Sequence, residues 1–259
     1  PVELVTACLD RIEATDDVVG AFVHVARSSA LAQAREAEEA LRLDRDLGPL
    51  HGIPVGVKDL VDVSGLPTEA GSPLRAGRVA DADAEAVRRL RDAGAIFVGK
   101  TRTDPFAYGA STPGTANPWD PARVAGGSSG GSAAAVSARQ CSLAIGTDTA
   151  GSIRIPAALC GVVGLKPTHG EVPRRGVVPL SWSYDNVGPI GRSVTDVAAM
   201  FEVMSGWATG SDRGRRGQRP GEAEGDLSGV RVGVPTNHFF DDVEAEVEAA
   251  VRAGMALLE

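Results

Sequence analysis

Short apolar runs in this chain alternate with longer stretches in which apolar residues recur every three or four positions. The helical period covers about residues 2–15, 28–43, 84–93, 194–206 and 243–258. The short apolar runs predict strands at 53–57, 96–98, 142–145, 162–165 and 230–234. Because helices and strands follow one another along the chain, the pattern predicts an α/β fold.

Capping and turn residues indicate where further elements begin. A glycine–serine stretch opens a helix that continues through 133–139, and a short helix is expected after Pro156. Ser193 and Asp196 resemble a capping box, with Asp in place of Glu or Gln, and the helix that follows is expected to end near Gly206. These signals add helices between the predicted strands.

The two ends of the chain and one internal stretch differ from this regular pattern. Residues 207–229 are rich in Gly, Arg and Glu and predict a surface loop or an insertion. The chain opens at Pro1, directly before a helical pattern, and ends at Glu259, inside another one. We therefore expect a chain that is truncated at both ends.

Composition and charge narrow the class of protein. Among the 259 residues, 43% are hydrophobic and 23% are charged, which is enough for a sizeable core. The formal net charge of −8 gives no support to a nucleic-acid surface, and the small basic cluster near Arg215 is better explained as a solvated linker. No apolar run has membrane-spanning length, so no membrane partner is expected.

The cysteines and histidines argue against disulfides and metal sites. The three cysteines form no C-x-x-C pair and fit reduced, buried thiols, which favours a cytoplasmic location; they are Cys8, Cys141 and Cys160. None of the four histidines has metal-ligand spacing, so no metal is expected. Ser152 does not lie in a G-x-S-x-G elbow, and the glycine-rich stretches lack the P-loop pattern.

Two serines in glycine-rich backbone and one lysine carry the candidate chemistry. Ser128 lies in GGSSGGS at 126–132, Ser152 lies in DTAGSIR at 148–154, and Lys58 ends an apolar run. Each has a simpler explanation. The first serine could belong to a flexible helix start, Ser152 could cap a helix, and Lys58 could be a surface lysine.

Taken together, the three residues favour acyl transfer without histidine. A serine hydroxyl needs a base, and burial can lower the pKa of a lysine from about 10.4 towards roughly 7–8. A second serine can relay the proton, because a hydroxyl both donates and accepts. The backbone N–H groups of Thr149, Ala150, Gly151 and Ser152 could hold the developing oxyanion.

Several separate motifs, in order and spacing, closely resemble the amidase signature family over nearly the whole chain. They lie at residues 52–59, 117–136, 146–156, 161–167 and 185–189. The resemblance implies the amidase signature fold, in which helices flank a central mixed β-sheet. It also implies that residues 1–259 form about the N-terminal half of such a domain.

The resemblance also implies roles for the candidate residues. Ser152 matches the acylated nucleophile, Ser128 matches a bridging serine held in a cis peptide, and Lys58 matches the buried base. Ser129, Asp148 and Arg154 match supporting positions of the family. An ordinary structural ion pair would also explain Asp148 and Arg154. Family members use no metal and no organic cofactor.

The implied function is hydrolysis of small amides through an acyl-Ser152 intermediate. Two alternatives stay open: a component similar to the A-type subunit of a glutamyl/aspartyl-tRNA amidotransferase, and an allophanate-type hydrolase of urea derivatives. Ile155 stands where the tRNA-linked subunit typically has Gln, which speaks against the first alternative. Ala150 and Arg102 are further departures from the family pattern. A small amide is the expected partner, no nucleic acid is expected, and a homodimer is left open.

Overall fold

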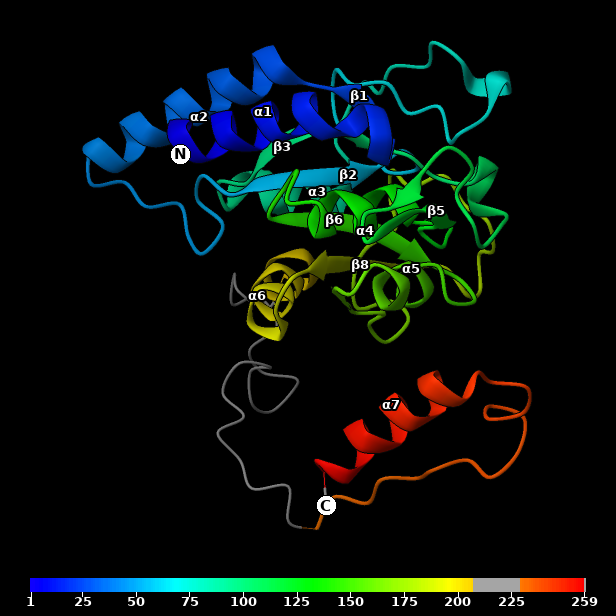
Figure 1. The fold of residues 1–259 in the computed structure, drawn as a ribbon. Helices are drawn as coiled ribbons and strands as arrows, with labels where there is room; N and C mark the ends of the chain where they lie inside the picture. The colour runs from blue at the N-terminus through cyan, green and yellow to red at the C-terminus, as the bar shows by residue number, and fades with distance from the viewer. Residues whose placement is uncertain (207–228, 259) are drawn as a thin grey trace. The chain divides into compact units, whose positions relative to one another are not determined.

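The computed structural model describes residues 1–206 and 229–258, which belong to two units, Pro1–Gly221 and Glu222–Glu259 (Figure 1). The first unit contains a six-stranded sheet in the order β1-β3-β2-β6-β8-β7. Its strands are β1 (Phe22–Val25), β2 (Pro54–Lys58), β3 (Ile96–Thr101), β6 (Leu143–Asp148), β7 (Val163–Gly164) and β8 (Asn186–Gly191). β2 is parallel to β3 and β6, and the other pairs are antiparallel. The sheet is mixed, which confirms the predicted fold class.

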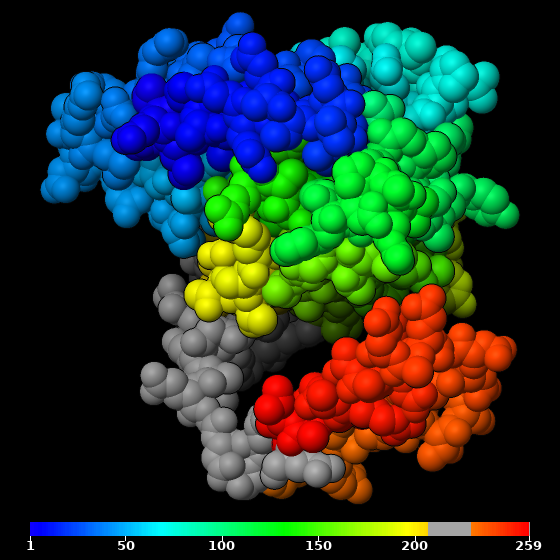
Figure 2. All heavy atoms as spheres, viewed as in Figure 1, coloured from blue at the N-terminus to red at the C-terminus, as the bar shows by residue number. Residues whose placement is uncertain are grey.

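Helices cover both faces of this sheet. The helices of one face are α1 (Val2–Val19), α2 (Arg27–Arg42) and α4 (Gly130–Ser137), and those of the other are α3 (Glu85–Asp92) and α6 (Val194–Ser205). Successive strand residues point to opposite faces, so Ile96 and Val98 join the first core while Phe97 joins the second. In the first unit, α1 and α2 lie side by side and form an outer surface (Figures 1 and 2). The ends of the strands lie between the two layers of helices, and the candidate site is found at these ends.

Most of the predicted helices and strands are confirmed. The capping signal is confirmed in detail: the Ser193 Oγ accepts a hydrogen bond of 3.1 Å from the Asp196 amide at the start of α6. Gly206 ends that helix with φ of 85°, in the left-handed region that glycine favours. The glycine–serine stretch does open α4, whose first residue is Gly130.

Two predictions about element boundaries and strands were wrong. The helix expected after Pro156 is α5 (Arg154–Leu159), which begins before the proline because the first turn of a helix tolerates its missing N–H. Residues 230–234 form no strand, since they pair with no described residue and a β-strand requires a partner. Of the predicted loop at 207–229, residues 207–228 lie outside the described part of the chain.

Some strands were not predicted. β8 has the sequence NVGPIG, in which two glycines and a proline lower the β-propensity. All six residues are nevertheless buried, between β6 on one side and β7 on the other. A short hairpin of β4 (Ala116–Asn117) and β5 (Asp120–Val124) was also missed. Tertiary pairing outweighs local propensity at these positions.

The second unit contains the predicted final helix. It is α7 (Ala245–Ala256), and none of its residues is buried. Across the described residues of both units, no helix combines the length and the apolar character needed to cross a bilayer.

Candidate active site

The candidate residues gather where two parallel strands end side by side. β2 ends at Lys58 and β6 ends at Asp148, and the two strands pair directly with each other. Helix α4 begins immediately after Ser129. Because neighbouring parallel strands end at the same edge of a sheet, this topology brings Lys58 to the start of α4.

Lys58 is completely buried and contacts three hydroxyl groups. Its Nζ lies 2.7 Å from the Ser128 Oγ, 2.8 Å from the Ser129 Oγ and 2.8 Å from the Thr147 Oγ1. Among the described residues, no carboxylate lies within ion-pair distance of it. Burial lowers the pKa of Lys58 from 10.5 to about 7, against the opposing charges of nearby carboxylates, of which Asp104 acts most strongly.

Counting protons separates the two serines that contact Lys58. The Ser129 Oγ donates to the Thr147 carbonyl at 3.0 Å and accepts from the Thr147 amide at 3.2 Å, so its single proton is already used. A neutral lysine amine has two N–H bonds and one lone pair, and that lone pair must accept from a hydroxyl. Ser128 or Thr147 can supply this proton. Ser129 can only accept from the amine and orient it.

The backbone that carries Ser128 is packed tightly. The Gly127–Ser128 peptide bond is cis, as the resemblance implies. A side chain at Gly127 would collide with the carboxylate of Asp104, which is buried and accepts the Thr112 amide at 3.0 Å. The Asp104 amide in turn donates to the Ser128 carbonyl at 3.4 Å. Asp104 therefore fixes the backbone on which Ser128 is held.

The loop after β6 is organised around Asp148. The carboxylate of Asp148 is fully buried and accepts the Gly151 amide at 2.9 Å and the Ile153 amide at 3.1 Å. Arg154 adds a two-point contact, with its Nε at 3.0 Å and its Nη2 at 2.9 Å. Burial acts to raise the pKa of Asp148, but the hydrogen bonds and charge of Arg154 outweigh it and the pKa is lowered. The Asp148–Arg154 pair therefore holds the loop that carries Ser152 in place.

Ser152 itself is nearly buried, at 8% exposure, and its carbonyl accepts the Ser129 amide at 3.1 Å. Among the described residues, the Ser152 Oγ forms no hydrogen bond, so the structure brings Ser128 to Lys58 without an Oγ–Oγ bond to Ser152. The Gly151 amide is committed to Asp148, whereas within the described residues the amides of Thr149, Ala150 and Ser152 have no acceptor. These three amides are the available oxyanion donors.

A pocket of about 340 Å³ opens beside these groups. Thr147 and Thr149 line it, together with Arg174 and Trp182. Asp185 also lines it and is held by the Thr149 Oγ1 at 2.5 Å and by the Leu180 and Ser181 amides. The pocket therefore borders Thr147, which contacts Lys58, and Thr149, the first residue of the loop that carries the free amides.

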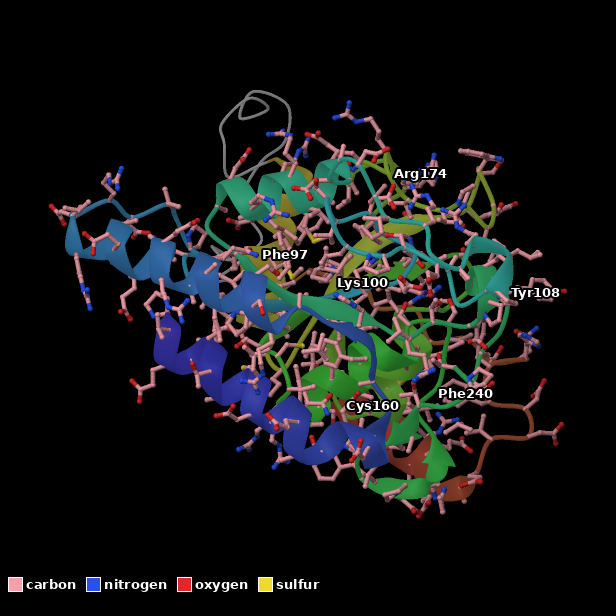
Figure 3. All side chains as sticks on the ribbon, turned by 90° about the horizontal axis from the view of Figure 1, so that it is seen from above. Phe97, Lys100, Tyr108, Cys160, Arg174 and Phe240 are labelled. Atoms are coloured by element: carbon pink, nitrogen blue, oxygen red, sulfur yellow. The ribbon has the colours of Figure 1, made fainter. Side chains whose placement is uncertain are left out.

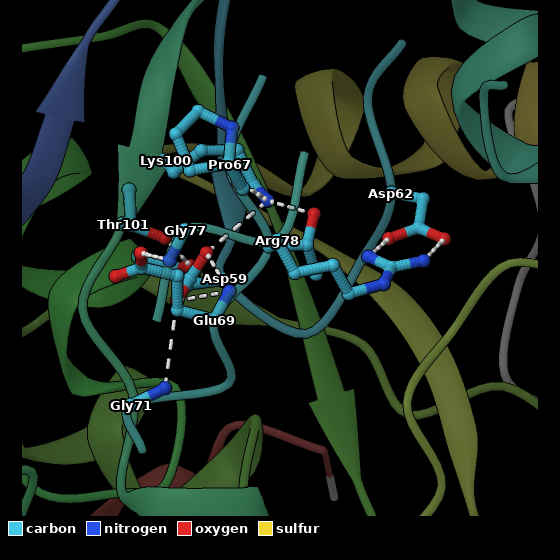
Figure 4. A network of polar contacts seen from close by, with 11 residues as sticks. Asp59, Asp62, Pro67, Glu69, Gly71, Gly77, Arg78, Lys100 and Thr101 are labelled. Atoms are coloured by element: carbon cyan, nitrogen blue, oxygen red, sulfur yellow. Dashed lines mark hydrogen bonds and ion pairs between the residues drawn. The ribbon is translucent and has the colours of Figure 1, made fainter. Parts of the chain in front are cut away.

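A second buried lysine, Lys100, lies on β3, which pairs with β2 (Figures 3 and 4). The Lys100 Nζ donates to the Pro67 carbonyl at 2.7 Å, the Thr68 Oγ1 at 2.8 Å and the Asp59 carboxylate at 3.2 Å. Asp59 also accepts the Glu69 amide. Unlike Lys58, Lys100 has a carboxylate partner, so the network ties down the segment that follows β2.

Sequence reasoning missed four polar residues of this region. They are Lys100, Asp104, Thr147 and Asp185. Thr147 and Asp185 lie inside the motif stretches, so their positions did carry a signal. Lys100 follows an apolar run at the end of β3, the same pattern that drew attention to Lys58. Nothing in the local sequence around Asp104 indicates its contact with Gly127.

Residues 1–206 and 229–258 contain no group of three His, Cys, Asp or Glu side chains placed to hold a metal ion. Around Lys58 and Ser152, the groups available for chemistry are hydroxyls, backbone amides and one amine of lowered pKa, while the carboxylates of Asp104 and Asp148 hold the backbone. Such a set can move a proton from a serine to a lysine and can stabilise a negative oxygen.

Comparison with known proteins gives a consistent family. The model of the family described as Amidase matches residues 3–259. An amidase of Pseudomonas putida is 49% identical over 262 residues, covering 100% of this chain and 56% of its own length. The A-type subunit of a glutamyl-tRNA(Gln) amidotransferase of Chloroflexus aurantiacus is 45% identical over 265 residues, covering 99% and 54%. The chain thus spans about half the length of the curated relatives it matches.

The solved structures agree with this match. One structure, described with a vestigial protein complex and the origins of an s-triazine catabolic enzyme, superposes with a TM-score of 0.77 and is 44% identical. The alignment covers 78% of this chain and 46% of that one. The fold is therefore shared with longer proteins.

Proposed function

This chain belongs to the amidase signature family of hydrolases, and on that premise we propose that it hydrolyses small amides through an acyl-Ser152 intermediate. The observation that carries the proposal is the buried Lys58, whose lowered pKa of about 7 and direct contact with Ser128 suit a base at neutral pH. Lys58, Ser128 and Ser152 are the catalytic residues of the proposal.

The acylation step follows from which groups around Lys58 can donate a proton and which can accept one. The Ser152 oxygen attacks the amide carbonyl as its proton moves to the Ser128 Oγ, and the Ser128 proton moves to the neutral Lys58 amine. The free amides of Thr149, Ala150 and Ser152 stabilise the oxyanion, each donor being worth about 3–4 kcal/mol. The C–N bond then breaks, and the proton on Lys58 returns through Ser128 to the leaving amine.

Deacylation uses the same groups in the same order. A water molecule attacks the acyl-Ser152 carbonyl and loses its proton through Ser128 to Lys58. The tetrahedral intermediate then releases the carboxylic acid, and the proton returns to the Ser152 oxygen. Small amides enter through the pocket beside Thr147 and Thr149.

A tRNA-linked amidotransferase component is the second candidate, supported by the 45% identity to the Chloroflexus amidotransferase chain. Ile155 and the net charge of −8 speak against it. The two candidates differ in what they need. A small-amide hydrolase releases ammonia from free amides alone, whereas the tRNA-linked component requires misacylated tRNA and partner chains.

An amide panel tests the proposal directly. The full-length protein is incubated with aliphatic amides, arylamides and urea derivatives, and released ammonia or amine is measured at pH 8. We expect turnover of at least one neutral small amide without tRNA or a second protein. Ammonia transfer that appears only with misacylated tRNA would favour the second candidate instead.

Replacing each of the two neighbouring serines should affect a different property, the rate for Ser128 and the stability for Ser129. Ser128→Ala removes the relay hydroxyl and is expected to lower kcat about 10²–10⁴-fold with little change in stability. Ser129→Ala leaves the buried amide and carbonyl of Thr147 without their partner, which costs about 1–3 kcal/mol of stability. Its effect on kcat should be smaller.

Steady-state rates and urea unfolding of the two variants measure this contrast. Equal rate losses for both serines would contradict the proton count that separates them. A larger rate loss for Ser129→Ala than for Ser128→Ala would show that Ser129, and not Ser128, relays the proton.

A further inference from the structure

Three exposed arginines line one pocket at the opposite end of β6 from Ser152. They come from separate elements: Arg11 from α1, Arg139 from the turn after α4, and Arg192 from the residue after β8. The pocket has a volume of about 490 Å³, and no acidic side chain lines it. Among the described residues, none of the three arginines forms an ion pair.

Two of these arginines also bind main-chain carbonyls. The Arg11 Nε donates to the Ala138 carbonyl at 3.0 Å, and the Arg192 Nη1 donates to the Cys141 carbonyl at 3.5 Å. Ala138 caps the C-terminus of α4, where a positive charge is favourable. Each contact uses one of the five N–H groups of a guanidinium, so most donors remain available.

Helix capping does not account for Arg139. Its side chain makes no hydrogen bond within the described part of the chain. Its amide donates to the Val136 carbonyl and the next amide, that of Gln140, donates to the Ala135 carbonyl, which is the Schellman pattern of a helix end. Glycine is preferred at this position because the backbone is left-handed, and Arg139 has φ of 61°.

An arginine is therefore held where its backbone is strained and its side chain has no structural partner. Strain of this kind marks a position at which function is worth testing. The same arginine adds a third positive charge to a pocket in a protein whose net charge is −8. We propose that this pocket binds a compact oxyanion that carries two or more negative charges.

The chemistry of the lining fits such a ligand. Guanidinium groups present paired N–H donors that match carboxylate and phosphate oxygens. The two cysteines of the pocket do not oppose an anion: burial raises the pKa of Cys8, and it raises the pKa of Cys141 to about 12, so both thiols stay neutral. Phosphate and small di- or tricarboxylates share the required charge and size.

Calorimetric titration of the purified full-length protein tests the proposal without any turnover. Inorganic phosphate and citrate are the two probes, with chloride at matched ionic strength as the reference. We expect saturable binding of at least one probe and none of chloride. The probe that binds tells phosphate chemistry from carboxylate chemistry.

Two substitutions at Arg139 make the test specific. Arg139→Gln removes the charge, and Arg139→Gly also removes the backbone strain. Both should weaken binding about tenfold or more, while Arg139→Gly raises the thermal unfolding midpoint of the free protein. Arg35→Gln is the matched control, because Arg35 is exposed on α2 and forms no ion pair with a described residue.

Arg139→Gly is expected to weaken binding and to raise the thermal unfolding midpoint, and this combination excludes misfolding as the cause of the weaker binding. A variant that is more stable and yet loses the ligand would support the site. The proposal is overturned if neither probe binds, or if Arg139→Gly binds as tightly as Arg35→Gln does.

Discussion

Ser152→Ala is expected to abolish both amide hydrolysis and covalent labelling by a fluorophosphonate. The substitution removes the attacking oxygen, and loss of a serine nucleophile of this kind lowers kcat by about 10⁴-fold or more. The fold should survive, because the Ser152 Oγ makes no hydrogen bond to a described residue and the loop is held by Asp148 and Arg154. Intact mass spectrometry before and after labelling measures the adduct.

A matched serine provides the control for this experiment. Ser183 is exposed and lies outside the Lys58 contacts, so Ser183→Ala should keep full labelling and full turnover. Peptide mapping of the labelled protein should place the adduct on Ser152. An adduct of unchanged yield in the Ser152→Ala variant would move the nucleophile to another residue, Ser128 being the first to examine.

The sequence predicted part of the arrangement at the sheet edge. It placed Lys58 at the end of one strand and DTAGSIR after another, and the parallel pairing of β2 and β6 brings these two strand ends to the same edge. The three hydroxyls around Lys58 could not all be predicted, because hydrogen-bond partners depend on where α4 lies against β6. Thr147 was inside a motif, yet only the structure shows that its Oγ1 contacts the amine.

Backbone amides were harder still to predict. The sequence predicts four oxyanion donors in a row, but a buried carboxylate competes for them, and Asp148 binds the Gly151 amide. The predicted strand at 230–234 failed for a related reason, since pairing with a partner determines a strand more than its own pattern does. β8 is the converse case, with poor propensity and a complete set of partners.

The lowered pKa of Lys58 links the proposed chemistry to stability. Folding lowers this pKa from 10.5 to about 7, so between these values the unfolded chain binds a proton that the folded protein does not. Stability therefore rises with pH through this window, and below about pH 7 the buried amine costs the folded state about 5 kcal/mol. A base that works at neutral pH is obtained by burying an amine at that cost.

Lys58→Met should separate these two consequences. We expect kcat/KM to fall by about 10³-fold or more, because the base is lost while the side chain keeps its length. The wild-type rate should rise with pH up to about 7 and then level off, and this limb should be absent in the variant. Rates between pH 5 and 9 with a neutral amide substrate measure both effects.

The same variant should alter the pH dependence of unfolding. Relative to Lys58→Met, the free energy of unfolding of the wild type should increase by about 5 kcal/mol as the pH rises from 7 to 10.5. In Lys58→Met, the hydrogen bonds to Ser128, Ser129 and Thr147 are lost at every pH. Comparing the slopes of the unfolding free energy against pH cancels this constant contribution. Lys166→Met is the matched control, since the Lys166 amine donates to the Pro167 carbonyl and forms no ion pair with a described residue. A near-normal rate in Lys58→Met, or parallel stability curves for the two proteins, would remove Lys58 from the mechanism.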